Sequence, residues 1–414
     1  MEATFGPGGA SAPSTLLAIA GRVPVRRLSP LNASASMDGS LRILHITAPG
    51  EAGGLERVVE TLAPGQVDAG HRVTVLAVVG RGEAHSNRLR KLRERTGVDL
   101  HMAPLPPRAY RKERRVTARL LASQGPNVVH THGYRPDVVD SGVARSLGFP
   151  TVSTVHGFTG GGLKNRFYEG LQRKAHGRMD AVVAVSRPLA RHLEREGLPR
   201  ERIQVVGNAW SEDPDFLPRD EARRTLKCPD GDLHLGWVGR MSREKGPDLL
   251  VDALRHLDGV PVRASMVGVG AVLPRVQQRA REGGVSHLVG WHGLLPDAVR
   301  YFQAFDVLVL SSRSEGSPMV LFEAMAAGVP IVATAVGGVP DMVSSREALL
   351  VPAEDPAALA EAIRQVAADP EGANERARSA HARLRREFNV ERWVAAYDEV
   401  YRAVMTQRVG VPIP

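Results

Sequence analysis

The sequence has little that would support disulfide, zinc-cluster or membrane-spanning structure. Its single cysteine, Cys228, excludes a disulfide within one chain and any cysteine zinc cluster. No apolar run approaches the ~20 residues that a membrane-spanning helix needs. Hydrophobic residues make up 43% of the chain and charged residues 24%. This composition is typical of a soluble globular protein, and the cysteine count predicts a reducing, cytoplasmic location.

The length of 414 residues favours two domains rather than one. Residues 1–36 are rich in Gly, Ala, Ser and Pro and lack a long apolar core. This composition predicts a disordered extension rather than a signal peptide. Met37 directly precedes the first predicted strand, so whether translation starts at Met1 or Met37 stays open.

The net charge of +9 is concentrated in one stretch of the chain. Arg81–Arg119 contains twelve Lys and Arg against four Asp and Glu. One interpretation is the solvated face of two surface helices. The other is a patch that docks on anionic lipid headgroups or an anionic acceptor. Aromatic residues do not interleave with these charges, so nucleic acid is not an expected partner.

Short apolar runs alternate with helical stretches along the chain, which predicts an α/β fold with two doubly wound parallel sheets. We expect an N-terminal Rossmann-like domain over 37–208 and a C-terminal one over 209–388, joined through the Pro- and acid-rich segment Ala209–Asp232. Such domains place the carboxyl ends of their strands at a common cleft. The predicted strands are Leu41–Thr47, Arg72–Val79, Val98–Ala103, Asn127–His132, Pro150–His156, Ala181–Ser186 and Ile203–Asn208, then His234–Arg240, Val262–Gly268, His287–His292, Asp306–Ser312, Pro330–Thr334 and Ala348–Val351.

The last predicted helix, Asn389–Met405, carries a large apolar stripe. Its members are Trp393, Tyr397, Val400, Tyr401 and Val404. A stripe of this size needs a large partner surface, so residues 389–414 are expected to pack back on the N-terminal domain.

Glu315 and Glu323 frame the start of a predicted helix. Ser317 is a good N-cap and Pro318 suits the first helical position, which places Glu315 in the loop outside. Glu323 is surrounded by apolar residues, where an unpaired carboxylate would be costly. Two acceptors beside a helix N-terminus, which favours anions, suit a ligand with hydroxyls and phosphate. A nucleotide-sugar is such a ligand.

Two cations follow the first strand of the second half. Arg240 closes that strand, and Lys245 stands just before a helix. Together they can neutralise a departing diphosphate and so replace a divalent metal. The alternative is that these residues are ordinary surface cations in a polar loop, and this interpretation suits Arg243 better than Arg240 or Lys245. Gly268 and Trp291, at the next strand ends, are weaker candidates for shaping a base pocket.

The first half offers glycines and histidines at strand ends. Gly53 and Gly54 follow the first strand, where backbone N–H groups can approach a phosphate, although a structural turn explains them equally well. His132 and His156 end successive strands and predict a polar cleft floor. Neither has the spacing of a metal site, so no metal is expected.

Taken together, these segments resemble the retaining, nucleotide-sugar-dependent glycosyltransferases of family 4, which have the GT-B fold. The resemblance covers Leu41 to Met405. It rests on Gly53-Gly54-Leu55-Glu56, Gly239-Arg240 with Lys245-Gly246, Glu315 with seven residues before Glu323, and Ala326-Ala327-Gly328-Val329-Pro330 with Gly337-Gly338.

The resemblance implies roles for these residues. Arg240 and Lys245 would bind the donor diphosphate, approached by Gly54 from the other domain, and Glu323 would accept from the ribose hydroxyls. Glu315 would hold the transferred sugar, together with the backbone that follows Gly316 at Ser317, Met319 and Val320. His132 would contact the sugar near the reacting carbon. Many members have glycine where this chain has Pro318, which has no N–H to offer the donor.

The sequence thus predicts a retaining, metal-independent hexosyltransferase that needs no cofactor beyond its co-substrate. The donor would be a UDP- or GDP-linked sugar. The acceptor would be a carbohydrate or a lipid-linked sugar in polysaccharide, lipopolysaccharide or glycolipid biosynthesis, at the inner face of a membrane. Arg81–Arg119 and Thr159–Lys164 are the suspected acceptor loops. Three alternatives stay open: a glycoside hydrolase, a nucleotide-sugar epimerase of the same fold, and a non-enzymatic sugar- or lipid-binding module.

Overall fold

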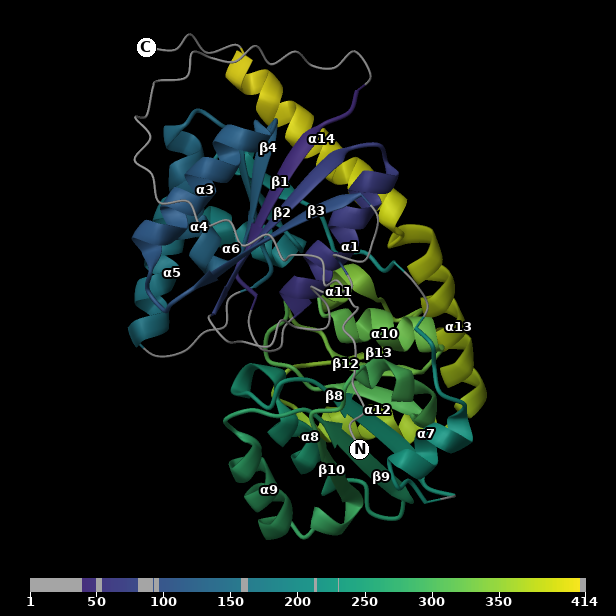
Figure 1. The fold of residues 1–414 in the computed structure, drawn as a ribbon. Helices are drawn as coiled ribbons and strands as arrows, with labels where there is room; N and C mark the ends of the chain where they lie inside the picture. Colours follow the sequence, from purple (N-terminus) through teal and green to yellow (C-terminus); the bar gives the residue numbers. More distant parts are fainter. Residues whose placement is uncertain are drawn as a thin grey trace, which may run out of the picture. The chain divides into compact units, whose positions relative to one another are not determined.

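The first half of the chain forms a seven-stranded parallel sheet (Figure 1). The computed structural model describes residues 39–49, 54–80, 92, 97–157, 163–211, 214–229 and 231–409. The strand order is β3-β2-β1-β4-β5-β6-β7. These strands are β1 (Arg42–Thr47), β2 (Arg72–Gly80), β3 (Val98–Leu105), β4 (Val128–His132), β5 (Thr151–Val155), β6 (Ala181–Ala184) and β7 (Ile203–Val205).

Described helices follow β1, β3, β4, β5 and β6, in line with the crossover connections that parallel pairing requires. Central strands β4, β5 and β6 are buried along their whole length, including the polar side chains that β4 and β5 carry. The helices are α1 (Gly54–Asp68), α3 (Tyr110–Gln124), α4 (Tyr134–Ser146), α5 (Leu163–His176) and α6 (Arg187–Arg195), and a 3₁₀ turn covers Arg200–Arg202.

The second sheet repeats this architecture with six parallel strands in the order β10-β9-β8-β11-β12-β13. The strands are β8 (Leu233–Val238), β9 (Val262–Val267), β10 (Val289–Gly293), β11 (Val307–Leu310), β12 (Ile331–Thr334) and β13 (Leu349–Val351). The helices are α7 (Arg219–Thr225), α8 (Pro247–Leu254), α9 (Leu273–Glu282), α10 (Met319–Ala327), α11 (Val339–Met342), α12 (Pro356–Ala368) and α13 (Pro370–Glu387), with 3₁₀ turns at Arg243–Lys245, Ser286–Leu288 and Ala298–Ala304.

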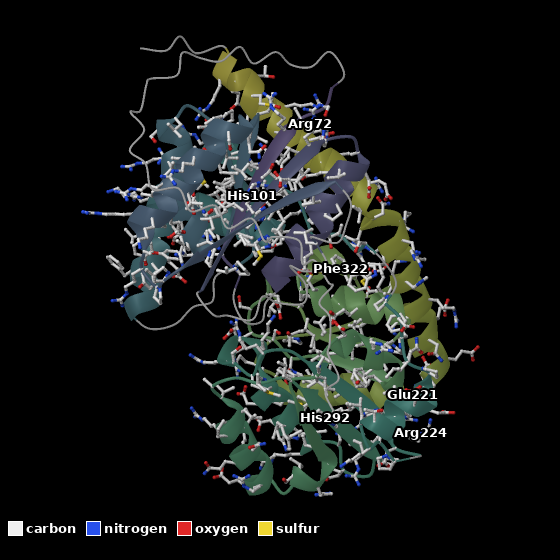
Figure 2. The ribbon with its side chains drawn as sticks, viewed as in Figure 1. Arg72, His101, Glu221, Arg224, His292 and Phe322 are labelled. Atoms are coloured by element: carbon white, nitrogen blue, oxygen red, sulfur yellow. The ribbon has the colours of Figure 1, made fainter. Side chains whose placement is uncertain are left out.

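The core beside the second sheet includes the interior face of α10. Phe322, labelled in Figure 2, is fully buried and packs its ring against Phe388 at a centroid distance of 5.0 Å. Trp210, which precedes α7, lies on the same cluster. The connecting segment after β7 and the end of α13 therefore both pack on α10.

The last helix, α14 (Val390–Val409), runs along the first sheet rather than the second (Figure 1). Its buried stripe of Trp393, Tyr397 and Tyr401 shares one cluster with Leu41, Ile43 and Val128 of the first sheet. Polar contacts reinforce this packing, because Arg408 donates to both carboxylate oxygens of Asp180 at 2.7 and 2.8 Å. Tyr397 and Tyr401 are the largest fully buried side chains of the described residues.

Every strand predicted from the sequence is present in the structure, with ends that differ by at most three residues. The α/β fold class with two doubly wound sheets is confirmed. Residues 1–36, Met37, Gly53, most of Arg81–Gly97 and the loop from Thr159 to Gly162 lie outside the described residues, and the domain boundaries stay a prediction. Among the described helices, none is both long and apolar enough to cross a bilayer.

Candidate active site

Each sheet has one point at which the strand order reverses, and these points are where open α/β sheets bind ligands. In the first sheet the order reverses between β1 and β4, and His132 is the last residue of β4. In the second it reverses between β8 and β11, which Arg240 and Glu315 follow. Gly54 begins α1, the helix that follows β1. The predicted site residues thus lie at both reversal points.

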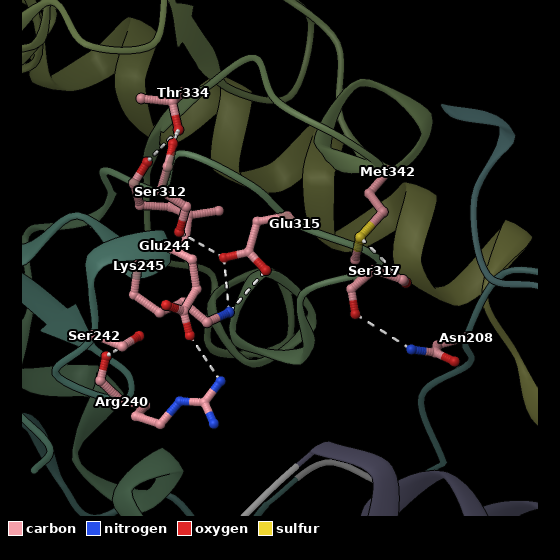
Figure 3. A network of polar contacts seen from close by, with 11 residues as sticks. Asn208, Arg240, Ser242, Glu244, Lys245, Ser312, Glu315, Ser317, Thr334 and Met342 are labelled. Atoms are coloured by element: carbon pink, nitrogen blue, oxygen red, sulfur yellow. Dashed lines mark hydrogen bonds and ion pairs between the residues drawn. The ribbon is translucent and has the colours of Figure 1, made fainter. Parts of the chain in front are cut away.

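Lys245 and Glu315 form the centre of the site in the second sheet (Figure 3). The Lys245 ammonium lies 2.8 Å from each carboxylate oxygen of Glu315. The hydroxyl of Ser312 donates to the same carboxylate at 2.5 Å. The Glu315 side chain is only 4% exposed, so its charge is compensated within the protein. A carboxylate held this way is fixed in position and is not a free nucleophile.

Arg240 lies beside this pair but is more accessible. Arg240 stands two residues beyond the end of β8 and not at its end, where the sequence predicts it. It donates to Glu244 at 2.8 Å, and its side chain is 54% exposed. Arg240 and Lys245 come from either end of the same short loop, as Figure 3 shows. Both predicted phosphate-binding cations are therefore paired with carboxylates.

Backbone packing fixes the loop that carries Glu315. A Cβ added at Gly316 would collide with the carbonyl oxygen of His156, and one added at Gly337 would collide with that of Glu315. Gly337 also has a φ of +52°, a conformation that favours glycine. These close approaches explain Gly316 and Gly337-Gly338 of the sequence motif. They also bring the loop against the residue that follows β5 in the first sheet.

The predicted start of α10 is wrong by one residue. Pro318, not Ser317, is the N-cap, because its ψ of 114° is extended and the helix begins at Met319. The Ser317 hydroxyl donates to the Met342 sulfur at 3.6 Å instead of capping the helix. The Ser317 carbonyl oxygen accepts from Asn208, in the segment after β7, at 3.3 Å. A tertiary contact thus replaces the local cap.

The remaining predicted donor residues occupy different surroundings. Glu323 is 7% exposed within α10, and Met319 and Val320 of its first turn pack on the second-sheet core. A Cβ added at Gly268 would collide with the carbonyl oxygen of Gly239, so backbone packing alone explains this glycine. Trp291 packs on the core from β10. Their proposed contacts with a nucleotide-sugar stay predictions.

His132 and His156 lie together, with ring centroids 6.2 Å apart in a stacked arrangement. Burial lowers the pKa of His156 to about 4 and that of His132 well below its usual value, with neighbouring histidines adding to the effect on His132. Both rings are therefore neutral at pH 7. His132 Nδ1 and His156 Nε2 are buried and have no hydrogen-bond partner among the described residues. Two unsatisfied ring nitrogens at strand ends favour a polar ligand there.

Sequence reasoning missed two further histidines on the same sheet. His45 of β1 pairs in register with His130 of β4, and their ring centroids lie 5.1 Å apart. Ring nitrogens of His45, His130 and His132 all lie within 4.8 Å of one another. The period of two between His130 and His132, which places both on one face, was the available signal. His45 joins them only through strand pairing.

The comparisons with known proteins agree with this architecture. A profile described as Glycosyltransferase Family 4 matches residues 52–212, and one described as Glycosyl transferases group 1 matches residues 232–369. The D-inositol 3-phosphate glycosyltransferase 1 of Catenulispora acidiphila is 31% identical, over 61% of this chain and 67% of that protein. The chain belongs to the family 4 glycosyltransferases.

Other similar proteins share the fold or part of the sequence. The putative teichuronic acid biosynthesis glycosyltransferase TuaC of Bacillus subtilis is 31% identical over 58% of this chain and 60% of its own length. The Anabaena Alr3699/HepE structure in complex with UDP-glucose has a TM-score of 0.74 and 20% identity, covering 88% of this chain and 100% of that one. This structural similarity confirms the GT-B fold.

Proposed function

We propose that this glycosyltransferase moves a hexose from a nucleoside-diphosphate sugar to an acceptor hydroxyl with retention of configuration. The observation that supports it most is the pairing of Lys245 with Glu315 beside the start of α10. A cation, a fixed acceptor and a helix N-terminus then lie together, which suits a diphosphate joined to a sugar. UDP or GDP would be the nucleotide, and the complex of Alr3699/HepE with UDP-glucose makes UDP the first to test.

In this proposal Arg240 and Lys245 neutralise the charge that develops on the departing diphosphate, which makes a divalent metal unnecessary. Glu323 would accept from the ribose hydroxyls. Glu315 would accept from hydroxyls of the sugar, and Gly54 would bring its backbone to the phosphates from the first sheet.

The reaction would proceed on one face of the sugar. The bond between the anomeric carbon and the phosphate oxygen breaks while the acceptor oxygen bonds to the same carbon from the same side. The acceptor proton passes to the departing phosphate. No covalent enzyme intermediate is needed, which fits a Glu315 carboxylate held by Lys245 and Ser312.

Single substitutions in the loop after β8 test the proposal. Arg240→Ala and Lys245→Ala should each lower nucleotide release from a nucleotide-sugar by about a hundredfold, because each removes charge stabilisation from the transition state. The control is Arg243→Ala, which removes an exposed cation from the same turn. Unchanged turnover in both variants would refute the assigned roles. Turnover without added nucleotide would instead indicate a hydrolase, and recovery of an isomerised donor an epimerase.

We further propose that the acceptor is lipid-linked or is met at an anionic membrane. The described part of the basic stretch supports this, because α3 exposes a cluster of cations: Arg111, Lys112, Arg114, Arg115 and Arg119. The teichuronic acid glycosyltransferase TuaC suggests a cell-envelope polymer as one acceptor class. Flotation with anionic and neutral liposomes tests the docking. The double variant Arg111→Glu, Arg115→Glu should abolish binding to anionic liposomes. The control, Arg191→Glu with Arg195→Glu on α6, should still bind. Equal flotation with anionic and neutral liposomes would reject the docking proposal.

A further inference from the structure

A buried chain of hydrogen bonds leads from α14 to His132. His132 Nε2 lies 2.9 Å from His45 Nδ1, and His45 Nε2 lies 2.7 Å from the side-chain oxygen of Gln66 in α1. The Gln66 amide nitrogen donates to the hydroxyl of Tyr401 in α14 at 3.2 Å. All four side chains are at most 1% exposed, so water does not compete for these bonds.

A second branch begins at the same tyrosine. The Tyr401 hydroxyl lies 2.7 Å from His130 Nδ1, and His130 Nε2 lies 2.8 Å from the Thr154 hydroxyl. Thr154 in turn contacts the Tyr397 hydroxyl at 2.9 Å. Both ring nitrogens of His45 and both of His130 therefore have partners. Of the three clustered histidines, His132 alone keeps a ring nitrogen, Nδ1, without a partner in the part of the chain that the structure describes.

The orientation of the Gln66 amide determines the direction of every bond in the chain. A neutral imidazole has one N–H and one proton-free nitrogen, so each bond fixes the next. The Gln66 oxygen accepts from His45 Nε2, which therefore carries the proton. His45 Nδ1 is then proton-free and accepts from His132 Nε2. His132 Nδ1 is left without a proton.

The second branch is consistent with the same orientation. The Tyr401 hydroxyl accepts a hydrogen bond from Gln66. It then donates its own hydrogen bond to His130 Nδ1. His130 Nε2 then carries a proton and donates to Thr154. Burial lowers the pKa of His45 to about 4 and that of His130 well below its usual value, which keeps both rings neutral. One glutamine orientation satisfies both branches.

We propose that Gln66 and His45 are positioning residues that hold His132 as the Nε2–H tautomer, with Nδ1 presented as a hydrogen-bond acceptor for a hydroxyl of the transferred sugar. The assignment of the sugar contact rests on the proposed function. The tautomer rests on the hydrogen-bond chain alone. The same chain gives the buried Tyr401 of α14 a role, since its hydroxyl accepts from the amide of Gln66.

The chain also accounts for the three clustered histidines without a metal. A shared ion would require His45 or His130 to give up a hydrogen bond to Gln66, His132, Tyr401 or Thr154. A purified protein should therefore contain far less than one equivalent of zinc. One equivalent that is lost in a His45→Ala variant would overturn the proposal.

Nitrogen NMR of the full chain with labelled histidines tests the tautomer directly. His132 Nδ1 should give the signal of an unprotonated ring nitrogen and Nε2 that of a protonated one. His71 provides an internal reference, because its Nδ1 accepts from the Leu41 backbone N–H at 3.1 Å and so its Nε2 carries the proton. A protonated Nδ1 at His132 would mean the opposite Gln66 orientation and would overturn the proposal.

Variants connect the tautomer to turnover. Gln66→Leu should let both tautomers of His132 form in the NMR spectrum and lower kcat by at least about tenfold. The rings that present the wrong nitrogen account for about twofold of this loss, and the less firmly held ring accounts for the rest. Gln66→Glu, which still accepts from His45, should keep the tautomer and more of the activity. Tyr397→Phe is the matched control: it removes a buried hydroxyl at the far end of the chain and should leave both readouts unchanged.

The outcomes separate this proposal from the proposed function. A proton-free His132 Nδ1 in a protein that turns over no nucleotide-sugar would keep the tautomer and reject the function. Turnover with a protonated Nδ1, or turnover in Gln66→Leu equal to that of the native chain, would keep the function and reject the positioning role.

Discussion

The histidine cluster predicts an unusually steep loss of stability in mild acid. Burial lowers the pKa of His45 and His156 to about 4, and those of His130 and His132 fall well below the usual value. The unfolded chain keeps ordinary values near 6.5. Between about pH 6.5 and 4 the unfolded state therefore binds protons that the folded state excludes, so stability falls as the pH falls. The full contribution is present only above pH 6.5.

The size of the effect follows from proton linkage. Each histidine contributes about 1 kcal/mol per pH unit within this window. From pH 7.5 to 5.5 His45 and His156 together should remove about 3 kcal/mol, and His130 and His132 should add to this loss. Urea unfolding followed by circular dichroism at a series of pH values measures this loss.

A matched pair of variants isolates the cluster from carboxylates that titrate nearby. His45→Asn should reduce the dependence of the unfolding free energy on pH by about 1 kcal/mol per unit, whatever it does to the absolute stability. Ser123→Ala, which changes an exposed residue of α3 and no titratable group, should leave the dependence unchanged. If all three proteins give parallel pH profiles, the pKa of His45 is not lowered in the folded state.

Two further predictions concern packing. Gly316→Ala should lower kcat/KM for the donor by at least about tenfold, because the added Cβ would displace the Glu315 loop from the His156 carbonyl. The control is Gly170→Ala, in an open position of α5, which should be harmless or should stabilise the protein by about 1 kcal/mol. Asp180→Asn should lower the free energy of unfolding by about 1–2 kcal/mol, because it removes the two-point contact of Arg408 in α14 with Asp180. The midpoint of urea unfolding measures this change, and an unchanged midpoint would contradict the anchoring role of the contact.

Much of the fold was predictable from the sequence because parallel strands covered on both faces leave continuous apolar runs. Ala181-Val182-Val183-Ala184 and Pro330-Ile331-Val332-Ala333 are such runs. Gly316 and Gly337 stand in the motif, but the carbonyl oxygens that exclude a Cβ there, those of His156 and Glu315, are revealed only by the structure. The apolar runs are local, so the sequence carries them directly.

Long-range contacts were not predictable. The Ser317 hydroxyl contacts Met342 instead of capping α10, although its local sequence has the pattern of a good cap. His45 was missed because nothing near it in the sequence indicates a role. Its partners Gln66 and His132 come from α1 and β4, and the tyrosine that orients Gln66 lies 335 residues further along the chain.

The two ion pairs of the site differ in what a ligand must overcome, and this yields a last prediction. Arg240 and Glu244 are 54% and 24% exposed, so separating them should cost less than about 1 kcal/mol. Glu315 is 4% exposed and is held by Lys245 and Ser312, so that pair is expected to persist. An arriving diphosphate should therefore displace Glu244 from Arg240 and bind beside Lys245 while Lys245 keeps Glu315 in place.

Glu244→Gln should consequently strengthen nucleoside-diphosphate binding by up to about fivefold, because Arg240 is freed in advance and a nearby negative charge is lost. Calorimetric titration with UDP and GDP measures the change. Glu361→Gln, which makes the same change of net charge on α12, should have no effect and so controls for long-range electrostatics. Weaker binding in Glu244→Gln would show that Glu244 orients Arg240 for the phosphate instead of competing with it.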